Sequence, residues 1–239
     1  MSPLSARSWV FSRAAADASF YHSRNQSRGS AAGTKGFGNM KKLVIASNNP
    51  GKLREIERIL SPLGLEALPQ SVFNIPEAEE PHCTFIENCL AKARHASEHS
   101  GLPALADDSG ICVAALNGAP GVYSARFAGE PKSDQRNNQK LLEALANEAN
   151  RNAHYYCVIV LVRHPHDPEP LIAEGVWEGE ILREPRGSAG FGYDPLFLVP
   201  QLGKTGAELG MDEKNRISHR GKALAQLVEK LRHAAGEAI

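Results

Sequence analysis

The sequence lacks an apolar run long enough to cross a membrane, since a transmembrane helix needs about 20 consecutive apolar residues. It also lacks paired cysteine motifs, because its four cysteines show neither a CxxC spacing nor a regular framework. Cysteines of this kind are typical of reduced, buried thiols in a reducing compartment. The sequence therefore predicts a cytoplasmic protein with no membrane partner.

An excess of basic charge is missing as well, because 27 lysines and arginines are matched by 27 aspartates and glutamates. The balance is uneven: residues 1–39 carry a net charge of +4, which leaves −4 on residues 40–239. Affinity for nucleic acid depends on neutralising many phosphates with lysine and arginine. The mildly acidic remainder therefore predicts no nucleic-acid partner, and any phosphate site must be local.

Residues 1–39 are rich in serine, alanine, glycine and arginine and show no helical or strand period. We expect a disordered N-terminal extension here and a single domain over residues 40–239. Such a composition is typical of an organellar transit peptide. The alternative is an extension upstream of a working start at Met40, and we favour it because a strand follows Met40 at once.

The remaining sequence alternates helix and strand patterns. Apolar residues at helical spacing indicate helices from Gly51 to Pro62 and at 84–100, 133–145 and 218–233. Short apolar runs indicate strands at 42–47, 155–162, 171–177, 181–183 and 196–199, with a strand pair around an acidic turn at 107–110. The run 155–162 is apolar throughout, which is typical of a central strand buried on both faces. This order predicts an α/β or mixed-sheet fold covered by helices.

The first candidate for chemistry is the segment Ser47–Lys52, between a predicted strand and a predicted helix. Backbone N–H groups at the helix start, the helix dipole and the Lys52 ammonium together suit phosphate oxygens. The segment is not a Walker A loop, because Ala46 and Leu53 stand where that motif needs glycine and serine or threonine. A turn without function is the alternative.

The second candidate is acidic, with Glu77, Glu79 and Glu80 in one loop and Asp107 with Asp108 after a strand. Clustered carboxylates favour a hard cation such as Mg²⁺, which binds a few carboxylates together with phosphate oxygens and water. For the glutamates, the alternative to a metal site is a solvated run of charges without function. For the aspartates this alternative is weaker, since unpaired charge near a core is costly.

Two further candidates lie toward the C-terminus. The glycine-rich loop 190–195 presents two aromatic rings that suit stacking on a base, with core aromatics in a turn as the alternative. Lys214 and Ser218–Arg220 offer cationic donors at the start of the last helix, with ordinary cap and surface residues as the alternative. His95 and His99 match the spacing of inverted zinc proteases, but we expect no zinc on the polar side of a packed helix.

Six motifs occur in series, namely SNNPGK, TFIENC, ADDSG, GAPGVYSARFAG, GFGYDP and ISHRG. Together they resemble the inosine/xanthosine triphosphate pyrophosphatase family, the house-cleaning nucleotide hydrolases, over about residues 41–232. The resemblance implies an elongated α/β fold, with a mixed sheet, flanking helices and two lobes around a central cleft, and a homodimer. It also implies Mg²⁺-dependent hydrolysis of dITP, ITP and XTP to the monophosphate and pyrophosphate.

The resemblance implies a role for each matching residue. Glu80 and Asp108 would bind the metal, and Asp108 would also accept the proton of the attacking water. Asp107 would be a metal or supporting ligand, and Arg126 a phosphate contact. Substrate would contact Ser47, Asn48, Asn49, Pro50, Gly51, Lys52, Asn88, Ser109, Phe191, Gly192, Tyr193, Asp194, Lys214, His219 and Arg220.

The residue types also suggest a basis for selectivity and leave two other functions open. Donors such as His219 and Arg220 facing a 6-keto oxygen would oppose the 6-amino group of adenine, so ATP should be a poor substrate. The paired Asp107 and Asp108 suggest a phosphatase with an aspartyl nucleophile as an alternative. The glycine loops are also compatible with a non-catalytic nucleotide-binding module.

Overall fold

The computed structural model describes residues 40–236, so the extension expected at 1–39 lies outside the described residues. The described chain contains a seven-stranded sheet in the order β2-β1-β3-β4-β5-β6-β7. β1 pairs in parallel with β2 and β3, and the later neighbours pair antiparallel. The strands are β1 (Lys42–Ile45), β2 (Glu66–Pro69), β3 (Ala104–Val113), β4 (Asn152–Val162), β5 (Leu171–Ile181), β6 (Phe197–Val199) and β7 (Lys204–Thr205).

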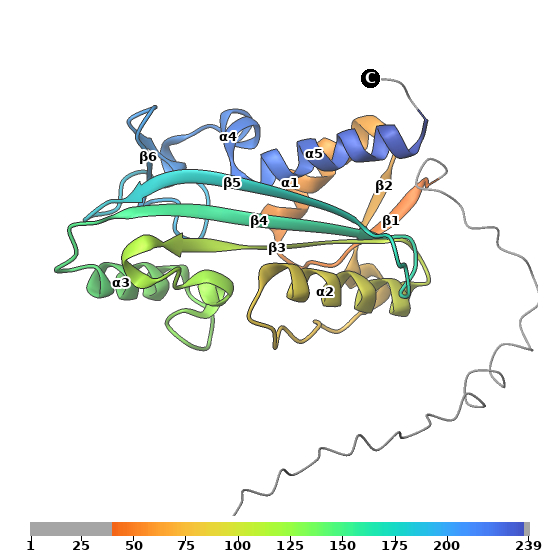
Figure 1. Ribbon diagram of the computed structural model, residues 1–239, viewed down its shortest axis with the longest axis horizontal. Helices are drawn as coiled ribbons and strands as arrows, with labels where there is room; N and C mark the ends of the chain where they lie inside the picture. The colour runs from red at the N-terminus through yellow and green to blue at the C-terminus, as the bar shows by residue number, and fades with distance from the viewer. Residues whose placement is uncertain (1–39, 237–239) are drawn as a thin grey trace, which may run out of the picture. The chain divides into compact units, whose positions relative to one another are not determined.

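Helices cover both faces of this mixed sheet, which confirms the predicted α/β class. In Figure 1, α2 and α3 lie on one face, and α1 and α5 lie on the other. The α-helices of the described chain are α1 (Pro50–Leu60), α2 (Phe85–Ser100), α3 (Asp134–Ala144), α4 (Met211–Ile217) and α5 (His219–Ala234). None of the helices in residues 40–236 is both long and apolar enough to span a bilayer.

The predicted helix starts are confirmed by their caps. Thr84, Ser133 and Ser218 each accept a backbone N–H from the first turn of the helix that follows. These side chains satisfy a donor that has no partner inside the helix, which stabilises each start by about 1 kcal/mol. The start of α5 carries His219 and Arg220, so this cap fixes where those two residues lie.

The core has two layers because successive side chains of a strand point to opposite faces. In β4, Cys157, Ile159 and Leu161 pack toward α1 and α5, while the alternate residues Val158 and Val160 pack toward α2. All five are fully buried. β4 is also the fourth of the seven strands. The prediction of a central strand covered on both faces is therefore confirmed.

A third apolar cluster lies toward the other end of the long strands. It joins Leu141 of α3 to Tyr155, Trp177 and Phe197 of β4, β5 and β6. α5 packs closely on β5 beside this cluster, because a Cβ atom at Gly175 would collide with the backbone carbonyl of His219. The absence of a side chain at Gly175 thus lets the first turn of α5 reach the sheet.

Two predictions about the strands are wrong. Residues 107–110 form no turn but lie inside β3, where Asp107 pairs with Ile159 and Asp108 with Val158 of β4. Residues 171–183 are not two strands, because β5 pairs with β4 continuously from Leu171 onward. In both places polar or glycine residues suggested a break, but the long apolar strand β4 provides a continuous hydrogen-bonding partner. The sequence pattern also does not predict the short elements β2, β7 and α4.

Candidate active site

The sheet has an open edge at the middle of β3. β1 ends at Ile45, opposite Leu105, whereas β3 continues to Val113. From Ala106 to Ile111, no strand among the described residues pairs with this edge. The carboxyl end of β1 and the start of α1 meet here, which is the usual place for a ligand in an α/β sheet.

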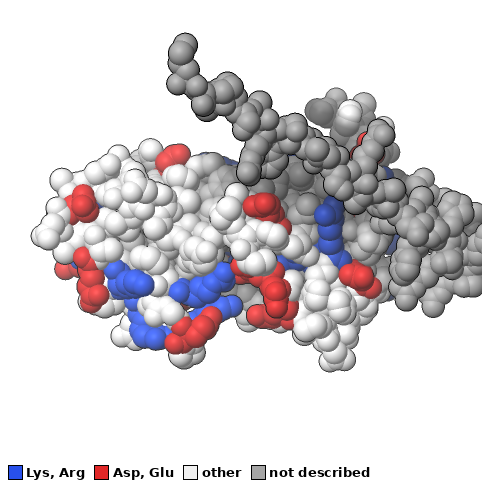
Figure 2. All heavy atoms as spheres, turned by 60° about the horizontal axis from the view of Figure 1, so that its bottom comes forward, with Lys and Arg blue, Asp and Glu red and all other residues white. Residues whose placement is uncertain are grey.

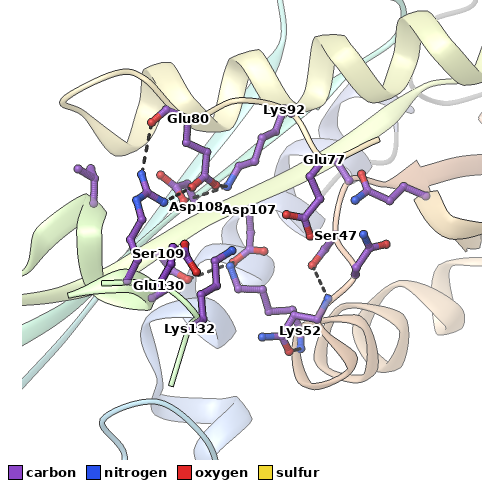
Figure 3. A pocket seen from close by; sticks show the side chains of 18 residues that line it. Ser47, Lys52, Glu77, Glu80, Lys92, Asp107, Asp108, Ser109, Glu130 and Lys132 are labelled. Atoms are coloured by element: carbon purple, nitrogen blue, oxygen red, sulfur yellow. Dashed lines mark hydrogen bonds and ion pairs between the residues drawn. The ribbon is translucent and has the colours of Figure 1, made fainter. Parts of the chain in front are cut away.

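A cavity of about 440 Å³ lies at this edge, within the usual size range of ligand sites. Its residues come from segments far apart in the sequence, and Figure 3 shows the labelled side chains around a common space. The charged and hydroxyl residues that line it are Ser47, Lys52, Glu77, Glu80, Lys92, Asp107, Asp108, Ser109, Arg126, Glu130 and Lys132. The cavity thus combines cations with carboxylates, as the sequence motifs predict.

The turn between β1 and α1 is closed by its own side chains. The Oδ1 atom of Asn49 accepts hydrogen bonds from the N–H groups of Gly51 and Lys52, at 2.8 and 3.2 Å, and Pro50 occupies the first turn of α1. Ser47 Oγ accepts from the N–H of Asn49 at 3.1 Å. These N–H groups are therefore used within the turn. The group that the turn directs into the cavity is the Lys52 ammonium.

Glu80 and Asp108, the predicted metal ligands, lie on either side of Lys92 from α2. The Nζ atom of Lys92 is 2.9 Å from Glu80 Oε1 and 2.9 Å from Asp108 Oδ1. Arg126 adds a second cation, with Nη1 2.9 Å from Glu80 Oε2. Burial alone would raise the pKa of Glu80, but Lys92 and Arg126 outweigh it and lower the pKa to about 2. Lys92 is not among the residues that the sequence motifs predict.

The neighbouring carboxylates of β3 have pKa values shifted in opposite directions. Burial raises the pKa of Asp108, and the charge of Lys92 opposes this shift only in part. Burial acts in the same direction on Asp107, but Lys52 and Arg220 outweigh it and hold the pKa of Asp107 well below its usual range. One oxygen of each, Asp107 Oδ1 and Asp108 Oδ2, is buried without a hydrogen-bond partner. Two carboxylates whose pKa values are shifted apart, as in Asp107 and Asp108, suit two different roles in one site.

Arg220 is held between carboxylates inside the protein. Its Nη1 atom is 2.5 Å from Glu55 Oε2, and its Nη2 atom is 3.1 Å from Asp107 Oδ2. Nη2 also donates to Ser109 Oγ at 2.9 Å, and the side chain of Arg220 is only 2% exposed. Glu55, one helical turn after Lys52, is a further residue that the motifs do not predict. The buried guanidinium therefore fixes the side chains of Asp107 and Ser109 through these contacts.

A second cavity of about 130 Å³ adjoins the first, because Asn49, Lys52 and Ser109 line both. The other residues that line it include the four predicted loop residues Phe191–Asp194, the cations Lys214 and Arg220, and the imidazole of His219. The structure thus brings the predicted base-binding residues together, next to the predicted phosphate site.

The two aromatic rings of the loop 190–195 differ in their surroundings. The Phe191 ring has the Lys214 ammonium 4.9 Å and the Arg220 Cζ atom 5.8 Å from its centroid. Tyr193 is 3% exposed, belongs to the apolar core, and donates its hydroxyl to Ser124 O at 2.8 Å. Phe191 is therefore the ring that faces the charged wall, whereas Tyr193 anchors the loop.

Asp194 and His219 complete this wall. Asp194 Oδ2 accepts from the N–H of Phe191 at 2.9 Å and from the Lys214 ammonium at 2.5 Å. The His219 ring stacks on Tyr155 with centroids 4.6 Å apart, and its Nδ1 atom is buried without a partner. Burial, together with the charges of Arg220 and Lys214, holds the pKa of His219 well below its ordinary value. A neutral imidazole next to two cations results.

Asn88 takes a place different from the other predicted substrate contacts. It is 1% exposed and lines neither cavity. Its Oδ1 accepts from the N–H of His82 at 3.0 Å, and its Nδ2 donates to His82 O at 3.1 Å. Asn88 therefore fastens the loop that carries Glu80 onto α2.

The histidines of the zinc-like pattern bond to nearby backbone. His95 Nε2 lies 3.0 Å from Pro76 O, and His99 Nδ1 lies 2.9 Å from His95 O. Within residues 40–236, no three histidine, cysteine, aspartate or glutamate side chains are grouped as a metal cluster. Both histidines are therefore used in local contacts with backbone oxygens.

Comparison with known proteins identifies the family. The model of the Ham1 family matches residues 43–230. This chain belongs to the Ham1 family. The resemblance drawn from the six motifs is thereby confirmed, and the cavities described above are those of a Ham1-family protein.

Relatives of this Ham1-family chain are similar over most of their length. The dITP/XTP pyrophosphatase of Nitrosomonas europaea is 67% identical over 80% of this chain and 95% of its own. That of Ralstonia nicotianae is 65% identical over 81% of this chain and 98% of its own. A solved HAM1 protein from Coxiella burnetii is 53% identical, with a TM-score of 0.77 over 81% of this chain and all of its own.

Proposed function

We propose that this protein hydrolyses dITP, ITP and XTP to the monophosphate and pyrophosphate. The observation that carries the proposal is the pair of adjoining cavities, one charged and one partly aromatic, which share Asn49, Lys52 and Ser109. A polyphosphate tail suits the first cavity and a purine base suits the second. The names of the relatives as dITP/XTP pyrophosphatases support the same substrates.

The carboxylates of the large cavity fit a divalent metal ion, which we take to be Mg²⁺. Asp108 Oδ2 is buried without a partner, so one hard oxygen donor remains available beside Glu80. Mg²⁺ is commonly bound by one or two carboxylates together with phosphate oxygens and water. Glu80 and Asp108 would hold the ion. When bound, it supplies charge neutralisation at the phosphates and a lowered pKa of a coordinated water.

The protein's own residues then have distinct tasks in the reaction. Asp108, whose pKa is raised by burial, is the group that accepts the proton of the attacking water. Asp107 stays ionised, and its Oδ2 atom holds the Lys52 ammonium at 3.0 Å. Lys92 spans Glu80 and Asp108 and keeps the two carboxylates together. The chemistry needs no phosphorylated protein group, so pyrophosphate leaves directly.

The cations of the large cavity divide into two kinds. Lys52, Lys92 and Arg126 each have a carboxylate partner within 3.0 Å. Lys132 has no carboxylate partner in residues 40–236, and Figure 3 shows its side chain extending toward Lys52 and Asp107. A triphosphate tail carries several negative charges, so Lys132 and Lys52 are the cations that we assign to it.

Selectivity for the base resides in the smaller cavity. The side chains there include the Lys214 ammonium, which can donate hydrogen bonds, and the neutral His219 ring. A 6-keto purine accepts hydrogen bonds at the position where adenine donates them. Sites built on such polar contacts reject a mismatched analogue by about 10⁴ to 10⁵. ATP and dATP are therefore poor substrates.

On the face shown in Figure 2, acidic and basic side chains of the described chain lie interspersed. This pattern supports a small-molecule substrate rather than a nucleic acid, which needs an extended basic surface. We further propose a homodimer located in the cytoplasm. Light scattering during gel filtration tests the dimer, and a monomer at working concentration would contradict it.

The proposed reaction is tested with a nucleotide panel assayed with and without Mg²⁺. Purified protein should release pyrophosphate from dITP, ITP and XTP only with Mg²⁺, and should act poorly on ATP and dATP. Release of inorganic phosphate without pyrophosphate would contradict the cleavage site and favour the aspartyl phosphatase. Tight triphosphate binding without turnover would instead favour a nucleotide-binding module.

A further inference from the structure

Helix α3 forms hydrogen bonds with both the N–H and the carbonyl oxygen of Gly192, in the loop 190–195 that lines the smaller cavity, here called the base cavity. Asp134 Oδ2 accepts a hydrogen bond from the N–H of Gly192 at 2.7 Å. Asn138, one turn further along α3, donates from Nδ2 to the carbonyl oxygen of Gly192 at 2.8 Å. Asp134 and Asn138 are four residues apart, so they lie on the same side of the helix. The two side chains thus bind both backbone groups of Gly192, and we call this pair of residues the α3 clamp.

The orientation of Asn138 is fixed by its two acceptors. Its Nδ2 atom also donates to the backbone oxygen of Asp134 at 2.7 Å, so both donor directions are used. Its Oδ1 atom is then left buried without a hydrogen-bond partner. A buried amide oxygen without a partner is costly. Asn138 thus donates to the carbonyl oxygen of Gly192 while its own amide oxygen stays without a hydrogen bond.

The residues on either side of Gly192 determine the shape of the base cavity. Phe191 precedes it and lies beside Lys214 and Arg220, whereas Tyr193 follows it and is anchored to Ser124 O. The α3 clamp is the contact that fixes the backbone between the two rings from the side of α3. Asp134 also lines the small cavity itself.

We propose that Asp134 and Asn138 are positioning residues for base selection, which act by fixing the backbone of Gly192 and thereby the place of the Phe191 ring. This inference rests on the proposed function, because it concerns how the same site distinguishes one purine from another. Neither residue belongs to the carboxylate and lysine groups of the large cavity. Loss of the clamp should therefore reduce recognition of the base more than cleavage of the phosphate chain.

The test compares dITP with dATP as substrates of the wild-type protein, of four single variants and of the double alanine variant. Asp134→Ala removes the acceptor for the Gly192 N–H, and Asn138→Ala removes the donor to its carbonyl oxygen. Asp134→Asn removes the charge but keeps an oxygen that can accept, so it is the conservative rescue. Gln135→Ala changes an exposed residue in the same turn of α3 and is the matched control.

The measured quantity is the ratio of kcat/KM for dITP to kcat/KM for dATP. We expect each alanine variant to lower this ratio about tenfold, the effect of losing one hydrogen bond at its upper range. The loss should come mainly from a higher KM for dITP. Asp134→Asn and Gln135→Ala should stay within about twofold of wild type. The double variant should lose less than the two single losses combined, because both residues act through Gly192.

Two results would overturn the inference. One is an equal loss of activity on dITP and dATP, which is what a merely structural role of α3 produces. The other is an unchanged ratio in both alanine variants whose melting temperatures match wild type. The proposed function fails separately, namely if wild-type protein itself shows no preference for dITP over dATP or releases no pyrophosphate.

Discussion

The ring of Phe191 lies directly against Gly51, because a Cβ atom added to Gly51 would stand 3.0 Å from Cε1 of that ring. Gly51 belongs to the turn that carries Lys52, whereas Phe191 belongs to the loop of the smaller cavity. The contact therefore joins the two cavities at a place where no side chain fits between them. A substitution at Gly51 should therefore affect binding of the base as well as binding of the phosphates.

The substitution Gly51→Ala tests this contact. The new methyl group would press on Phe191 and on Asn49 Oδ1, which lies 3.1 Å from the Cβ position. We expect kcat/KM for dITP to fall about tenfold or more, since displacements of this kind in a reactive site are costly. Gly210→Ala is the control, because its Cβ would meet no atom within 4 Å. Equal activity of the two variants would contradict the coupling of the cavities.

The substitution Asp108→Asn tests the proton acceptor. Asparagine keeps the shape of the side chain and an oxygen for Lys92, but it is not basic enough to take a proton from water. We expect kcat to fall by about 10² to 10⁴, the usual contribution of a general base, while circular dichroism stays that of wild type. Asp212→Asn removes a carboxylate that is 66% exposed and should leave turnover unchanged. Near-wild-type turnover of Asp108→Asn would remove this residue from the mechanism.

The substitution Arg220→Ala tests the buried charge network. It would leave Glu55 and Asp107 without their shared cation, and Arg220 itself is only 2% exposed. Removing one partner of a buried pair destabilises a protein by about 3–5 kcal/mol. Arg186→Ala breaks a partly exposed pair with Glu208, at 41% and 35% side-chain exposure, and it should destabilise the protein much less. Urea unfolding measures both, and similar free energies of unfolding would show that Arg220 is not a structural cation.

Removal of divalent metal ions tests the role assigned to Glu80 and Asp108. A chelator should abolish pyrophosphate release, and added Mg²⁺ should restore it, because the carboxylates leave room for phosphate and water ligands. Lys92 lies 2.9 Å from both Glu80 and Asp108 and compensates their charge, so far-ultraviolet circular dichroism should not change. Full turnover in excess chelator would contradict the metal site.

The substitution Lys132→Ala tests the lysine of the large cavity that has no carboxylate partner among the described residues. We expect KM for dITP to rise several-fold, with kcat nearly unchanged, since the side chain is exposed and would contribute mainly to binding. The effect should shrink as salt screens the charge. Lys41→Ala removes an exposed lysine outside both cavities and serves as the control. An unchanged KM at low salt would remove Lys132 from the phosphate site.

The parts of the fold that the sequence predicts well are those with a local cause. The caps Ser133 and Ser218 act within one helical turn, so their residue type and spacing are sufficient to place α3 and α5. The apolar run of β4 likewise indicates a strand buried on both faces. The prediction of a turn at 107–110 is wrong. Two aspartates are unfavourable inside a buried strand unless cations neutralise them, and the cations that do so are distant in the sequence.

The sequence by itself determined the family motifs, the helix starts and the central strand, because these depend on neighbours along the chain. Only the tertiary structure decided the partners of the charges. Arg220 meets Asp107 and Glu55 across 113 and 165 residues of sequence, and Lys92 meets Asp108 across 16. A buried charge is stable only beside a partner of opposite sign, and that partner is supplied by the packing of the α-helices against the sheet.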